Sequence, residues 1–244
     1  MAERADMMLR HAFSGFGISY EDALELLRNA DNLTDGQRVK RDILIAAVDN
    51  LADFAVAEEY QMAEELPDLD ELEDWEYGDD EYDIDEDYLN GLYAVCRKYN
   101  HNYAWVEDLD IEYAMIMANY LSQIKNETIL MYMTMGDERV RPWHLQYEGF
   151  TAPKSQFPAW LIPPIEHGCR CYLVEDSASS FAKIQAASQK IPEMPDWFNR
   201  TFKESVALGG RIFSDEHPYF QISEEHVDQL SEIAERIKNK YMAK

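Results

Sequence analysis

The residues with the clearest chemical potential follow Gly136. Within eight positions the chain places a carboxylate, two guanidinium groups and an imidazole: Asp137, Arg139, Arg141 and His144. Alternate positions of an extended chain share one face, so we expect the aspartate and both arginines on one side. A planar guanidinium can bond a carboxylate or several carbonyls at once. The pattern therefore predicts a loop clamp, in which Arg139 or Arg141 is buried and bonded to Asp137 or to loop carbonyls. A phosphate- or carboxylate-binding pair and a catalytic group are the alternatives.

A second group of reactive residues lies further along the chain, at His167, Cys169 and Cys171, with Cys169 25 positions beyond His144. Two thiolates and one or two imidazoles are suitable ligands for tetrahedral zinc. The Cys-x-Cys spacing, however, is tighter than the usual zinc knuckle. The sequence therefore predicts no metal and no cofactor, with the two thiols buried beside a Pro-Pro turn and a tryptophan. A zinc site made by His144, His167, Cys169 and Cys171 is the alternative.

The same residues contain the elements of a Cys-His-Asp arrangement for nucleophilic catalysis, in Cys169, His144 and Asp137. No local nucleophile signature accompanies them, and the chain has no glycine-rich phosphate loop. We therefore predict no catalytic residue and no enzymatic activity.

A longer pattern contains these groups. In chain order it consists of Asp137, Arg139, Arg141, His144, Gly149, Trp160, Pro163, Pro164, Cys169, Arg170 and Cys171. A later piece, 210–220, carries His217-Pro218-Tyr219. Over roughly residues 115–220, this order resembles the phage Mu F-like head morphogenesis family, also called the minor head or minor capsid protein family.

The resemblance implies a phage or prophage minor head protein that acts in virion assembly by docking to the portal or the inner capsid. The expected partners are therefore portal or capsid proteins, and the expected location is the virion or the bacterial host cytoplasm. The alternative is a phosphate-substrate enzyme or effector, nuclease- or transferase-like, that uses Arg139, Arg141 and His144.

The charge of the chain limits its partners. It carries 22 basic and 48 acidic residues, a net charge of −26. Such a surface repels nucleic acid and anionic lipid, so we expect no direct nucleic-acid binding and no membrane contact. No stretch approaches 18 consecutive apolar residues. Three cysteines, with Cys96 far from the other two, indicate reduced thiols rather than a disulfide framework.

The periodicity of the chain predicts an α+β fold. Residues 1–110 form an acidic helical region, and 111–244 form the Mu F-like domain with a C-terminal helix. Ser19, Thr34 and Ser223 can each cap a helix. Further helices are expected at about 86–98, after Asp108 and at 179–190. The segments 129–135 and 171–175 read as strands of a small sheet, since five prolines between them forbid a long helix.

Residues 58–87 differ from the rest of the chain because they hold 17 Asp or Glu and no Lys or Arg. Apolar and aromatic residues are interleaved with the acids, among them Trp75, Tyr77 and Tyr82. The composition favours a solvated linker. A docking strip for a basic partner is one alternative, and a calcium loop from Asp79 is another, although it lacks the glycine expected at its sixth position.

Overall fold

The computed structural model describes residues 1–67, 86–175 and 189–243. Its helices are α1 (Ala2–Gly15), α2 (Tyr20–Arg28), α3 (Asp35–Glu65), α4 (Glu86–Asn102), α5 (Asp108–Ser122) and α7 (Glu224–Met242), and a π-helical turn, η2 (Tyr103–Glu107), joins α4 to α5. Three short strands follow α5: β1 (Ile129–Met133), β2 (Thr151–Pro153) and β3 (Tyr172–Glu175). The predicted α+β class is confirmed.

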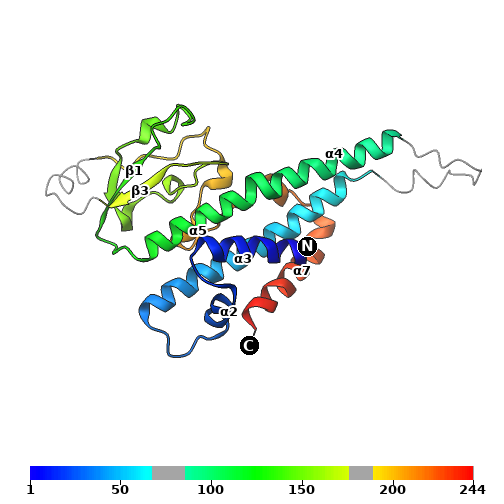
Figure 1. Ribbon diagram of the computed structural model, residues 1–244, viewed down its shortest axis with the longest axis horizontal. Coiled ribbons are helices and arrows are strands. Elements are labelled where there is room, and N and C mark those ends of the chain that lie inside the picture. Colours follow the sequence, from blue (N-terminus) through cyan, green and yellow to red (C-terminus); the bar gives the residue numbers. More distant parts are fainter. Residues whose placement is uncertain (68–85, 176–188, 244) are drawn as a thin grey trace, which may run out of the picture.

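The helices form one body beside the sheet (Figure 1). The segments α4, η2 and α5 run as one long rod, α3 runs alongside it, and α1 packs against both α3 and α5. The close approach of α1 to α5 requires a glycine, since a Cβ on Gly15 would collide with the carbonyl oxygen of Glu112. Helix α7 packs on α3, so the last helix returns to the N-terminal half. The apolar core runs continuously across residue 110.

The sheet has the order β2-β1-β3, and both pairings are antiparallel. Ile129 pairs with Pro153, and Met131 pairs with both Thr151 and Val174. The two predicted strand segments are therefore direct neighbours. We call β1, β2, β3 and the connections between them, 129–175, the sheet lobe. Apart from β2, the connection from β1 to β3 contains only short 3-10 turns, as its prolines require.

The predicted helix starts are confirmed, with one difference. The Ser19 hydroxyl accepts a hydrogen bond from the Asp22 amide at 3.1 Å, and Thr34 and Gln37 form a full capping box. Ser223 does stand at the start of α7, but its hydroxyl bonds Nδ1 of His226 at 2.8 Å rather than a helix amide. The histidine competes with the backbone for the cap.

The acidic run divides into a described and an undescribed part. Residues 58–65 continue α3 as regular helix, so this portion is not a linker. The linker, docking-strip and calcium-loop readings of 68–85, and most of the predicted 179–190 helix, lie outside the described residues. Within the residues that are described, no helix combines the length and apolarity needed to cross a membrane.

Candidate functional site

Asp137 pairs with Arg170 rather than with the arginines next to it. Its two carboxylate oxygens accept from Nη1 and Nη2 of Arg170 at 2.8 and 2.6 Å. This two-point ion pair ties the turn after β1 to the segment before β3. The Arg170 hydrogen bonds hold the pKa of Asp137 below its usual range, and the same bonds raise the pKa of Arg170. Both side chains meet solvent, so the pair orders the turn more than it stabilises the fold.

The predicted burial of Arg139 or Arg141 is wrong, because the chain turns after Asp137 instead of continuing as a strand. The Arg139 amide donates to the Asp137 carboxylate at 3.1 Å and the Val140 amide donates to the Asp137 carbonyl at 3.1 Å. Alternate residues in such a turn do not share one face. The Arg139 side chain is exposed.

Arg141 is also exposed but does bond a loop carbonyl, as predicted. Its Nη2 donates to the carbonyl of His167 at 2.8 Å, and its Nη1 lies 2.8 Å from Oε1 of Glu166. The same carboxylate oxygen lies 2.6 Å from Nε2 of His144. Glu166 therefore joins an exposed guanidinium to a buried imidazole, a role that the sequence analysis did not assign. Its position beside His167 in the motif was the available signal.

The structure brings His144, Cys169 and Cys171 together. All three side chains are buried, and one donor atom from each lies within 4.8 Å of the others. Nδ1 of His144 is 3.0 Å from Sγ of Cys171. Cys169 and Cys171 share a face because they alternate along extended chain, while Arg170 between them points outward to Asp137. Neither cysteine forms a disulfide.

The protonation of this cluster follows from its contacts. The hydrogen bond with Cys171, together with burial, raises the pKa of Cys169, so this thiol is protonated at neutral pH. The same contact from Cys169 lowers the pKa of Cys171. Burial opposes the charging of His144, but its contacts with Cys169 and Glu166 outweigh burial and raise its pKa. The three groups therefore share their protons as one unit.

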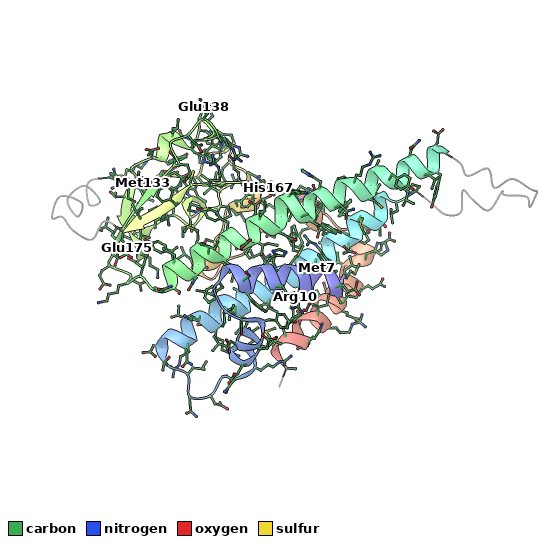
Figure 2. The ribbon with its side chains drawn as sticks, in the orientation of Figure 1. Met7, Arg10, Met133, Glu138, His167 and Glu175 are labelled. Carbon is green, nitrogen blue, oxygen red and sulfur yellow. The ribbon has the colours of Figure 1, made fainter. Side chains whose placement is uncertain are left out.

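His167 belongs to a different contact. Its Nδ1 lies 2.8 Å from Oδ2 of Asp110 on α5, and the Gly168 amide donates to Oδ1 of the same carboxylate at 2.8 Å. Asp110 is buried, and burial raises its pKa against the opposing effect of His167. Figure 2 shows His167 facing the long rod of helices, whereas Glu138 lies at the outer tip of the sheet lobe. The alternative zinc site of four residues is therefore wrong for His167, because this side chain bonds Asp110 and anchors the lobe to α5.

The other motif residues pack. Trp160 is buried and meets the rings of Tyr147 and Phe198 edge to face, each at 5.2 Å between centroids. Pro164 is buried and follows a cis peptide bond from Pro163. The predicted burial of the Cys169 and Cys171 thiols is confirmed, while their predicted packing beside these prolines and Trp160 stays a prediction.

His217 packs in the helical body, with its ring centre 6.4 Å from that of His167 in the sheet lobe. Its Nδ1 accepts from the Tyr219 amide at 3.2 Å, and its ring meets Phe54 edge to face at 4.9 Å. Burial, followed by the nearby charge of His167, lowers the pKa of His217 to about 4. It is therefore a neutral packing residue that fixes a chain reversal.

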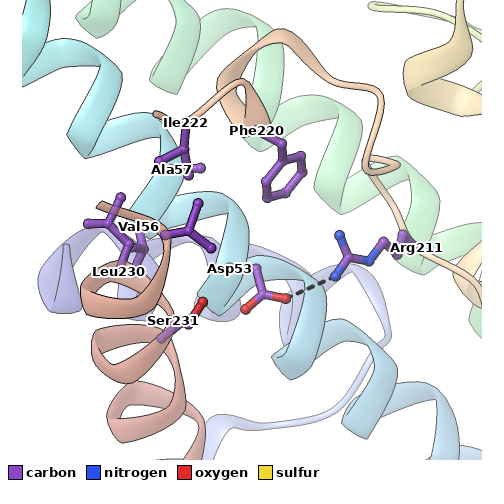
Figure 3. A pocket seen from close by; sticks show the side chains of 10 residues that line it. Asp53, Val56, Ala57, Arg211, Phe220, Ile222, Leu230 and Ser231 are labelled. Atoms are coloured by element: carbon purple, nitrogen blue, oxygen red, sulfur yellow. Dashed lines mark hydrogen bonds and ion pairs between the residues drawn. The ribbon is translucent and has the colours of Figure 1, made fainter. Parts of the chain in front are cut away.

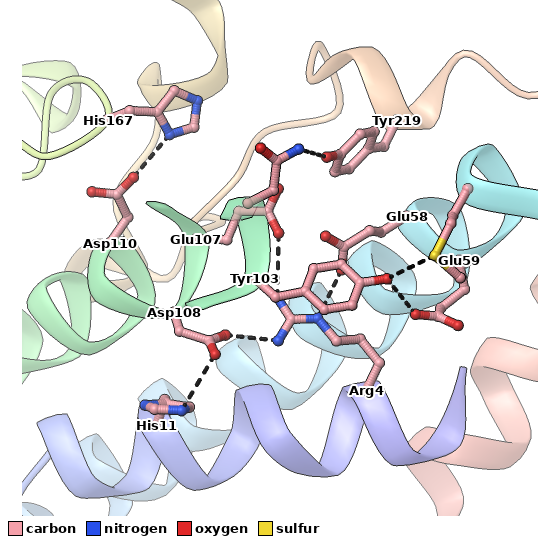
Figure 4. Close-up of polar contacts among 12 residues, drawn as sticks. Arg4, His11, Glu58, Glu59, Tyr103, Glu107, Asp108, Asp110, His167 and Tyr219 are labelled. Atoms are coloured by element: carbon pink, nitrogen blue, oxygen red, sulfur yellow. Dashed lines mark hydrogen bonds and ion pairs between the residues drawn. The ribbon is translucent and has the colours of Figure 1, made fainter. Parts of the chain in front are cut away.

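The helical body contains a buried ionic group that no sequence pattern predicted, shown in Figure 4. Arg4 donates to Glu58 at 2.9 Å, to Asp108 at 2.8 Å and to Glu107 at 3.2 Å, and its guanidinium lies 4.0 Å from the ring centre of Tyr103. We call these four charged residues the Arg4 cluster. The signal was a charged residue on the apolar face of α1, beside Ala5 and Met8.

A shallow pocket of about 190 Å³ lies between α3 and α7 (Figure 3). Asp53 and Arg211 form an ion pair of 2.9 Å in its wall, and Lys238 binds the same carboxylate at 2.9 Å. The volume lies below the roughly 300–1,000 Å³ of ordinary ligand sites, and its charged groups are already paired. It is a gap in the packing of α7 on α3 rather than a formed binding site.

Comparisons with known proteins place few constraints on this geometry. No family model matches the chain, and no solved structure matches it. An uncharacterized protein of Methanocaldococcus jannaschii is 45% identical over 42 residues, which cover 17% of this chain and 7% of that protein. The function must therefore be argued from the residues themselves.

Proposed function

We propose that the chain is a minor head protein of a phage or prophage, which acts in virion assembly through contacts with portal or capsid proteins. The observation that carries the proposal is that the motif residues bond one another. Asp137 holds Arg170, Arg141 holds Glu166 and the His167 carbonyl, and His144 lies against Cys171. Groups paired in this way stabilise a shape, which is what an assembly protein needs.

The same observation weighs against the phosphate-substrate enzyme. The cavity beside Arg139, Arg141 and His144 has a volume of about 10 Å³, the room of one water molecule. Arg141 and His144 already lie beside the carboxylate of Glu166. The net charge of −26 also repels an anionic substrate.

The order of the motif residues, which resembles the Mu F-like family, supplies the head-assembly part of the proposal. The charge supplies the kind of contact, since an acidic surface fits a basic patch on a portal or capsid protein and is repelled by packaged DNA. The densest acidic segment, 68–85, is the part we propose for this contact.

The test is assembly in the host that carries the gene. The chain is expressed with the portal and capsid proteins encoded beside it, particles are purified, and peptides from them are identified. We expect the chain in particles at low copy number. A variant that lacks about 66–87 should keep the 115–220 core folded but enter particles less well, and any isolated complex should weaken with added salt.

Two results would contradict the proposal. One is the absence of the full chain from particles that are otherwise complete. The other is turnover of a phosphate ester or phosphodiester that depends on Arg139 and His144, which would support the enzyme instead.

A further inference from the structure

The buried side chains of His144, Cys169 and Cys171 carry nitrogen and sulfur atoms that could bind a metal ion. Some polar atoms in and around this group also lack a hydrogen-bond partner. Among the described residues, five buried side-chain polar atoms lack a well-formed hydrogen bond, and three of them lie in or beside this cluster: Nε2 of His144, Oε1 of Glu166 and the Tyr132 hydroxyl, which faces Cys171. The last two are 2.6 Å apart, but poorly aligned for a hydrogen bond. Each such buried group calls for an explanation, such as strain, a bound water or a bound ion.

We propose that His144, Cys169 and Cys171 bind a zinc ion, which staples the two ends of the sheet lobe's long connection. Two sulfurs and one imidazole nitrogen form a donor set that selects zinc over hard cations such as calcium and magnesium. Their donor atoms already lie within 4.8 Å of one another. In a tetrahedral zinc site the donor atoms stand about 3.5–3.8 Å apart, so small side-chain rotations suffice.

The contacts of His144 orient it for this role. Its Nε2 faces Glu166, while its Nδ1 faces the sulfur of Cys171 at 3.0 Å. A carboxylate beside the far nitrogen keeps the proton there and leaves the near nitrogen free to bind a metal. Arg141 holds that carboxylate from the solvent side at 2.8 Å. The motif residues are thus layered, with thiols and imidazole inside, the carboxylate next and the arginine outermost.

The fourth position faces the small cavity lined by His144, Cys171 and Gly168 together with the arginines 139, 141 and 170. Its volume of about 10 Å³ admits one water and nothing larger. The ion would therefore have three protein ligands and a water, with no access for a substrate. Such a site cross-links the chain across 24 intervening residues that contain little regular structure. The inference goes beyond the proposed function and does not depend on it.

The experiment uses the full chain, purified under reducing conditions, stripped with a chelator and titrated with cobalt(II) and then zinc. We expect about one cobalt per chain, with the visible bands of a tetrahedral site and a thiolate charge-transfer band. Zinc should displace the cobalt, so the visible bands and the charge-transfer band should disappear. Zinc should also raise the melting temperature of the chain. The variants Cys169→Ser and Cys171→Ser should each weaken the charge-transfer band, and the double variant with both changes should lose it. Cys96→Ser is the matched control, because Cys96 is exposed on α4, and it should bind as the parent does.

A fourth variant tests the layered arrangement. Glu166→Gln keeps every proposed ligand but removes the charge beside Nε2, so zinc should bind about 10–100-fold more weakly. If the cysteine variants fail to fold, the parent itself gives the answer. Bound zinc should protect two thiols from alkylation and leave Cys96 reactive, and a mercurial reagent should release about one zinc. Binding of less than about a tenth of an equivalent by the parent would overturn the proposal. Cobalt bands that survive in the double variant, or that vanish in Cys96→Ser, would overturn it as well.

Discussion

The Arg4 cluster in the helical body and the Cys–His cluster in the sheet lobe are both buried polar groups, but their charges balance in opposite ways. Arg4 faces three carboxyl groups, so the helical body has an excess of acid. Burial, then the hydrogen bond with Glu107, raises the pKa of Glu58 to about 10, so a proton removes one of the negative charges. The sheet lobe instead gathers an imidazole and two thiols, whose nitrogen and sulfur atoms can bind a metal ion. A proton on Glu58 offsets the excess negative charge of the Arg4 cluster. In the Cys–His cluster, formed by His144, Cys169 and Cys171, we propose that a metal ion binds instead.

The largest effect that separates the two regions should come from Arg4→Met. The change leaves Glu58, Glu107 and Asp108 buried together without the guanidinium, although His11 still lies 3.3 Å from Asp108. We expect it to lower the free energy of unfolding at pH 7 by about 3–5 kcal/mol, the usual cost of breaking a buried ion pair on one side. Urea unfolding measures it. Arg10→Met is the control on the same helix, because Arg10 is exposed and its pair with Asp6 contributes little. Equal losses from both variants would mean that the Arg4 cluster is not what holds α1 in place.

The second prediction concerns the proton on Glu58. Its folded-state pKa is raised from about 4.5 to about 10, so the folded protein holds a proton that the unfolded chain has lost. The stability contributed by this proton is therefore complete below about pH 4.5 and declines as the pH rises toward 10. One proton gives a slope of at most about 1.4 kcal/mol per pH unit.

Glu58→Gln should flatten this slope between pH 6 and 9, which urea unfolding at several pH values can follow. Glu64→Gln, on the exposed side of the same helix, should keep the slope of the parent. If the stability of the parent falls no faster than that of Glu58→Gln between pH 6 and 9, then Glu58 is ionised in the folded state.

The third prediction concerns the link between the two regions. Asp110 on α5 holds both His167 and the Gly168 amide of the sheet lobe. Asp110→Asn keeps one acceptor but removes the charge, and we expect it to cost roughly 1–3 kcal/mol. Thermal unfolding compares it with Asp137→Asn, which removes an exposed partner of Arg170 and should cost less than about 1 kcal/mol. If the two variants melted alike, burial would not distinguish the two carboxylates.

The two regions also differ in how far their sequences predict them. The helical body follows from local signals, since the caps at Ser19 and Thr34 and the 3.6-residue period of α3 and α5 all act within a few residues. The sheet follows from β-rich segments bounded by turns. What local signals cannot give is the convergence of Arg4 on α1 with residues 54 to 104 positions away. The buried ionic group was therefore missed.

In the sheet lobe, the motif identifies the residues that matter but not their partners. The sequence pairs Asp137 with the nearby arginines because an extended chain would align them. The turn after Asp137 instead directs it to Arg170, which is 33 positions away. His167 seemed a companion of Cys169, yet it turns to α5. The convergence of His144 with both thiols depends on how β1 and β3 pair, which no spacing within the connection reveals.

The smallest effect should come from Arg139→Ala. This change tests whether Arg139 is a buried clamp, as the sequence predicted, or an exposed side chain, as the structure shows. A buried clamp would lose about 1–3 kcal/mol with this change, because its partners would be stranded. The exposed side chain seen here leaves none stranded, since the turn is held by the Arg139 backbone amide and by Arg170. We therefore expect the free energy of unfolding to change by less than about 0.5 kcal/mol. Thermal and urea unfolding measure it, with Arg170→Ala as the comparison. If Arg139→Ala proved the more destabilising of the two, the guanidinium would have buried partners in solution and the original clamp would be correct.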